Sequence, residues 1–145
     1  MKRVRSWNPA LVGFGLLVAA WWAAYLVRAV PWLVRSEVAH YAWALVVLVG
    51  ISVLRPAFAG NARQWWLLAL GLQLWSYCEH FLLVVQLGTG WRLANEPVPT
   101  SILQLLVPRV EMHEFYNTIV TIPMVVAVIL RALEHRAHAS AAHSS

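Results

Sequence analysis

Four long apolar segments dominate the pattern of hydrophobic and polar positions along the chain. Each is close to the roughly 20 residues that an α-helix needs to cross about 30 Å of hydrocarbon at 1.5 Å per residue. Arginines and tryptophans stand near the segment ends, among them Trp65 and Trp66, where they are typical of the boundary between lipid and water. The segments cover residues 7–27, 38–54, 65–86 and 110–130, and they predict an all-α integral membrane protein with four spans.

The connections predict how these spans are arranged. The first two connections are short, which favours antiparallel neighbours in a four-helix bundle. The first segment follows three basic residues like a signal peptide, but its length and the lack of a small-residue cleavage site indicate a retained span. We therefore expect one four-span domain over residues 1–134, followed by a polar flexible tail over residues 135–145.

The third connection, residues 88–109, is the only long one and contains three prolines. Within it, Ser101 and Gln104 have the spacing of a capping box, which starts a helix by pairing the Ser and Gln side chains with backbone N–H groups. The apolar stretch that follows is too short to cross a membrane. This pattern predicts a short interfacial or re-entrant helix, serving either as a lid over the bundle or as a plain amphipathic connector.

Composition and charge agree with a membrane protein. The chain of 145 residues is 61% hydrophobic and only 12% charged, which excludes a soluble monomer, and it has a single Cys and hence no intrachain disulfide. The net charge of +5 does not indicate nucleic-acid binding, because the basic residues are scattered between apolar segments; the lipid bilayer is the expected partner. With four spans, both termini lie on the same side of the membrane. That side carries seven basic residues: Lys2, Arg3, Arg5, Arg55, Arg63, Arg131 and Arg136. The other side carries four: Arg28, Arg35, Arg92 and Arg109. The positive-inside rule then predicts cytoplasmic termini, and we expect a bacterial inner membrane.

The few ionisable residues inside the apolar segments carry the functional argument, because a charge in a span costs about 2.5–3.5 kcal/mol. In the four-span topology they converge from three helices on one layer near the outer face. The members of this layer are His40, Glu79, His80, Glu111, His113 and Glu114.

Imidazoles and carboxylates together are the ligand set of Zn, Fe or Cu ions, so this layer predicts a transition-metal site. The residues do not reproduce a known motif. Glu37-x-x-His40 matches one Glu-x-x-His motif of di-iron bundles, but at the edge of its span, and the other helices supply no second one. Asn117 stands where the zinc motif H-E-x-x-H requires its second His, and the neighbouring carboxylates disfavour a haem pocket.

Other interpretations of the layer stay open at this point. His40 and Glu111 also fit side chains that simply lie at headgroup level, and the whole set could form an interhelical hydrogen-bond network or a proton pathway.

Three candidate functions of the chain follow from these interpretations. The first is a metalloprotein that oxidises or hydrolyses a lipid-soluble substrate, which would enter from the bilayer beneath residues 101–107. The second is a non-catalytic subunit of a larger membrane complex, of the respiratory or monooxygenase type, or a homo-oligomer. The third is a proton or ion conductor that uses Glu79, His80, Gln86 and Glu114.

Overall fold

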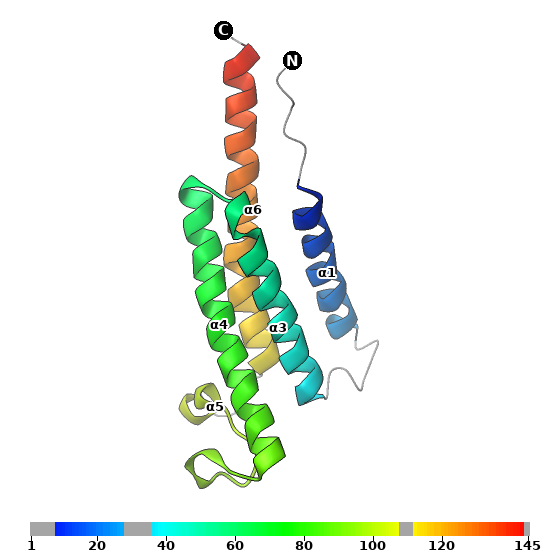
Figure 1. Ribbon diagram of the computed structural model, residues 1–145, viewed down its shortest axis with the longest axis vertical. Coiled ribbons are helices and arrows are strands. Elements are labelled where there is room, and N and C mark those ends of the chain that lie inside the picture. The colour runs from blue at the N-terminus through cyan, green and yellow to red at the C-terminus, as the bar shows by residue number, and fades with distance from the viewer. Residues whose placement is uncertain (1–7, 28–35, 108–111, 144–145) are drawn as a thin grey trace.

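The computed structural model describes residues 8–27, 36–107 and 112–143, and every regular element within these ranges is helical (Figure 1). Four helices are long and apolar enough to cross a membrane, which confirms the prediction of an all-α chain with four candidate spans. They are α1 (Pro9–Leu26), α3 (Glu37–Leu54), α4 (Gly60–Thr89) and α6 (Met112–His143). Three short elements join them: η1 (Arg55–Ala57), η2 (Leu93–Asn95) and α5 (Ile102–Leu106).

Side chains and glycine set most of the helix ends. Asn8 and Ser36 cap α1 and α3 by accepting hydrogen bonds from Ala10 N and Ala39 N. Helix α4 ends at Gly90, whose φ of 73° lies in the left-handed region that glycine adopts without strain. The capping box expected in the third connection is present, with Ser101 as the cap of α5. Helix α6 continues to His143, through most of the segment that the sequence assigned to a tail.

The apolar core lies between α3, α4 and α6, and Trp66 is its largest fully buried side chain. We expected Trp66 at the boundary between lipid and water, but its ring stacks on Phe58 with centroids 4.0 Å apart. Its indole N–H donates to the carbonyl oxygen of Ile51 over 2.8 Å, so the one polar group of this side chain is satisfied inside the protein.

Helix α1 is the most loosely attached of the long helices and stands beside α3 in Figure 1. Leu11 is its one buried residue among residues 9–26. Its contacts with the other helices include Phe14 against Gly50 of α3, Trp21 stacked on Trp43 with centroids 4.3 Å apart, and Trp22 Nε1, which donates to Thr121 Oγ1 of α6 over 3.1 Å.

Candidate functional site

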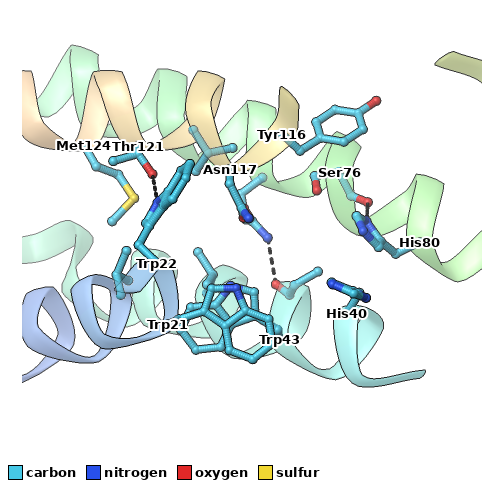
Figure 2. Close-up of a pocket in the computed structure, with 15 residues that line it drawn as sticks. Trp21, Trp22, His40, Trp43, Ser76, His80, Tyr116, Asn117, Thr121 and Met124 are labelled. Atoms are coloured by element: carbon cyan, nitrogen blue, oxygen red, sulfur yellow. Dashed lines mark hydrogen bonds between the residues drawn. The ribbon is translucent and has the colours of Figure 1, made fainter. Parts of the chain in front are cut away.

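A small cavity of about 30 Å³ lies between the four long helices (Figure 2). This space is enough for one or two water-sized groups, since a single water needs about 10–15 Å³ by the same measure. About half of the residues that line the cavity have polar side chains, which is unusual for the interior of a membrane-spanning bundle. The polar lining residues are His40, Gln73, Ser76, His80, Tyr116, Asn117 and Thr121.

Two histidines from different helices face each other at one end of this cavity (Figure 2). His40 of α3 is 3% exposed and His80 of α4 is 4% exposed, and their ring centroids are 6.4 Å apart. Burying two imidazoles side by side in an apolar bundle is costly, which makes their approach the first feature that needs a functional account.

Each imidazole is bonded in the same way to its own helix. His40 Nδ1 lies 2.8 Å from the carbonyl oxygen of Ser36, and His80 Nδ1 lies 2.7 Å from that of Ser76, in both cases four residues earlier. A carbonyl oxygen can only accept, so Nδ1 carries the proton in both rings. In the neutral form, Nε2 is then the nitrogen with the lone pair on both histidines.

Aromatic rings fix the orientation of the two imidazoles from the other helices. Trp21 of α1 meets His40 edge-on, with centroids 6.2 Å apart and planes at 90°. Tyr116 of α6 meets His80 with centroids 6.3 Å apart and planes at 60°. All four long helices therefore contribute to positioning this pair of rings, which is the arrangement expected of a preorganised site rather than of incidental packing.

Glu79 lies beside His80 in the sequence but has different partners. Its carboxylate, 1% exposed, accepts hydrogen bonds from Ile102 N over 2.8 Å and from Leu103 N over 3.0 Å. The hydroxyl of Tyr116 donates to the same carboxylate over 3.4 Å. Glu79 thus caps α5 from α4 and ties the long connection to the bundle.

Gln86, seven residues after Glu79 on the same face of α4, holds the earlier part of that connection. Its side-chain oxygen accepts from Leu93 N over 3.1 Å and from Thr100 N over 3.2 Å, and its Nε2 donates to Thr100 O over 2.8 Å. Arg92 adds a bond from Nη1 to the Gln86 carbonyl oxygen over 2.7 Å. The side chain is fully buried, so these backbone groups replace the water that it would otherwise bind.

The structure brings together part of the predicted metal layer. His40 and His80 adjoin, Glu79 is bonded to α5, and Glu114 is exposed near the start of α6. Glu111 and the side chain of His113 lie outside the described residues. Within the described part of the chain, no group of three or more His, Cys, Asp or Glu side chains is placed to hold a metal ion. The six-residue metal site stays a prediction.

Sequence reasoning missed the contribution of Tyr116, which contacts both His80 and Glu79. Its spacing contained a signal, since Tyr116, Val120, Met124 and Ala127 recur at intervals of three and four residues and are all buried. Tyr77, one turn before His80 on α4, is not among the residues that line the cavity, and its hydroxyl bonds that of Tyr41 over 2.8 Å.

Comparison with known protein families, with curated proteins and with solved structures found no match.

Proposed function

We propose that this chain is a membrane-embedded metalloprotein in which His40 and His80 bind a transition metal ion, Zn, Fe or Cu, through their Nε2 atoms. One observation carries the proposal: two buried imidazoles from different helices face each other, each with Nδ1 bonded to a backbone carbonyl. Metal-binding histidines use this arrangement, because the bond at one ring nitrogen fixes the tautomer and aims the other nitrogen at the ion.

The two rings are close enough for one ion to reach both after a small movement. A tetrahedral metal bound at about 2.0–2.1 Å from each Nε2 would hold the two ring centroids roughly 5 Å apart. The centroids of His40 and His80 are 6.4 Å apart, so binding would draw the two rings together by about 1 Å. Further ligands would come from water or substrate and from Glu111 and His113, which stand near the beginning of α6 in the sequence.

The proposed setting is an antiparallel four-span bundle with both termini in the cytoplasm of a bacterium, and with α5 as an interfacial or re-entrant helix over the outer end. The bonds from Glu79 and Gln86 to the connection support this place for α5, because they hold it against the end of α4. A transition metal ion with mainly histidine ligands, held in an apolar bundle, suits an oxidoreductase that acts on a lipid-soluble substrate.

Metal analysis of the full chain in lipid nanodiscs tests the proposal. We expect about one Zn, Fe or Cu ion per chain, and we expect His40→Ala and His80→Ala each to lose it, because one ligand alone holds these ions weakly. His135→Ala is the matched control, since His135 is exposed on the last part of α6 and its loss should leave the content unchanged. Circular dichroism establishes that each variant is folded.

A second measurement covers the case in which the ion is lost during purification. Addition of Co²⁺ to the wild-type protein should give the visible absorption of a nitrogen-ligated site, and both cavity variants should lack it. The proposal fails if the wild-type protein binds none of these ions, or if folded His40→Ala and His80→Ala variants bind them as the wild type does.

A further inference from the structure

A second and much larger cavity, of about 510 Å³, lies between α1 and α6. It is a groove with apolar walls, and its volume falls within the range of roughly 300–1,000 Å³ that small-molecule sites occupy. The wall on α1 includes Leu11, Gly15 and Val18, and the wall on α6 includes Thr121, Val125 and Ile129.

The groove is long enough to hold a hydrocarbon chain. Its lining runs along α1 from Leu11 to Trp22, which spans twelve residues or about 16 Å of helix. Gly15 stands between these ends, and no atom lies within 4 Å of the place where its Cβ would be. The absence of a side chain at this position therefore leaves open space in the groove.

One end of the groove adjoins the cavity that contains the two histidines. Val18, Trp22, Thr121 and Met124 line both spaces. The bond from Trp22 Nε1 to Thr121 Oγ1, 3.1 Å long, lies between them (Figure 2). Thr121 supplies the one hydroxyl group among the described residues that line the groove, so this end offers a polar contact and the rest does not.

We infer that the groove binds the substrate of the proposed metal centre: a lipid-soluble molecule with an alkyl or isoprenoid chain and a small uncharged polar end, such as a hydroxyl or carbonyl group. The chain would lie along Gly15, and the polar end would meet Trp22 and Thr121 beside the histidine cavity. This inference rests on the proposed function and specifies its substrate class. The entry path between α1 and α6 differs from the path beneath residues 101–107 that the sequence suggested.

The position of Thr121 argues against a phospholipid whose headgroup lies at this end of the groove. Thr121 is nine residues, or about 13 Å, from the first residue of α6. A phosphate headgroup at this depth would lie in hydrocarbon, where charged groups are strongly disfavoured. An uncharged hydroxyl or carbonyl can exchange hydrogen bonds with the Trp22 and Thr121 pair instead.

Photo-crosslinking of the full chain in phosphatidylcholine nanodiscs tests this inference. The probe is a long-chain aliphatic alcohol with a diazirine near the end of its chain, and mass spectrometry locates the label. We expect labels on residues 12–16 of α1 and 125–129 of α6, and competition by the unlabelled alcohol. Labels spread evenly over other exposed apolar residues, such as Val49 and Leu74, would overturn the inference.

A pair of glycine variants gives the matched control. Gly15→Leu places a side chain in the groove and should reduce the labelling about tenfold, because the same space cannot hold both groups. Gly13→Leu adds the same side chain two residues earlier on α1, where there is also open space but no groove lining, and should leave labelling unchanged. Equal labelling of the two variants contradicts a specific site.

Two further comparisons separate the possible outcomes. A phosphatidylcholine with a diazirine in its acyl chain should label the groove no more than other lipid-facing surfaces; preferential labelling that the alcohol does not reduce would identify ordinary lipid as the occupant and overturn the inference. Labelling by the alcohol should persist in His40→Ala and His80→Ala. If those variants and the wild type bind no metal but the groove is still labelled specifically, the metal proposal fails while the binding site stands.

Discussion

Two faces of α4 carry buried polar side chains, and they use them differently. On one face, Gln73, Ser76 and His80 line the cavity between the four long helices. On the other face, Glu79 and Gln86 bond to the backbone of the long connection. We refer to these as the cavity face and the loop face of α4.

Side chains on both faces bond to the backbone. On the loop face, Glu79 and Gln86 bond to backbone N–H and C=O groups of the connection in place of water, which is a structural requirement inside a membrane. On the cavity face, Gln73 Nε2 donates to Ala44 O over 2.8 Å and His80 Nδ1 donates to Ser76 O, but this face also places the His80 imidazole beside that of His40. Buried polarity on α4 therefore has two causes, and only the cavity face suggests a ligand.

The strongest test of this comparison is Glu79→Ala on the loop face. The change leaves Ile102 N, Leu103 N and the Tyr116 hydroxyl without their shared acceptor, and we expect the free energy of unfolding to fall by about 3 kcal/mol. Thermal unfolding in detergent measures this loss, and proteolysis should become faster within residues 93–107.

Glu96→Gln is the control for Glu79→Ala, because Glu96 lies half-buried in the same connection and the substitution keeps its size. Its effect should be within about 0.5 kcal/mol. If the conservative Glu79→Gln variant retains the stability but loses bound metal, Glu79 belongs to the ligand set and the distinction between the two faces does not hold.

Gln86→Leu tests the other member of the loop face. Leucine has a similar size but cannot bond Leu93 N, Thr100 N or Thr100 O, so we expect a loss of about 2 kcal/mol. Hydrogen exchange at residues 93–101 should become faster while exchange in α3 stays unchanged. The same substitution at Gln64, which is exposed on α4, is the matched control. An equal effect of the two variants would show that the bonds to the connection contribute little.

The sequence was sufficient to predict the elements of this fold because apolar length and capping residues act locally. The four long helices and the Ser101 capping box follow from such local signals. Glu79 and Gln86 are seven residues apart and therefore lie on one face of a helix, but their partners in the connection depend on how the chain returns to α4, which no local pattern specifies.

The candidate site was less predictable for the same reason. The sequence brought His40 and His80 into one layer, and the structure places their rings near each other. It could not indicate that Glu79 turns to α5, since residues 79 and 80 point in directions about 100° apart on a helix and either could face the cavity. The groove beside α1 depends on the distance between α1 and α6, which the hydropathy pattern does not determine.

Gly50→Ala tests whether the cavity face depends on α1. A Cβ at residue 50 would overlap the ring of Phe14, so this ring or α1 itself must move, with an expected cost of about 1 kcal/mol. Trp21 stacks on Trp43 and meets His40, so the tryptophan fluorescence of the Gly50→Ala variant should differ from that of the wild type, and metal content should fall. Gly71→Ala, which meets no atom within 4 Å, is the control. Hydrogen exchange of the connection should not change; if it does, the two faces are not independent.

The smallest expected effect comes from a polar contact that belongs to neither face. The hydroxyls of Tyr41 and Tyr77 bond each other over 2.8 Å between α3 and α4. Interhelical bonds in membrane proteins contribute on average about 0.6 kcal/mol, so Tyr77→Phe should lower the unfolding free energy by about this amount and leave metal content unchanged. The double variant with Tyr41→Phe should lose no more than the single one, because either substitution already removes the bond. A loss as large as that of Gln86→Leu would mean that buried polarity stabilises α4 regardless of its partner, and the contrast between the two faces would then have no energetic basis.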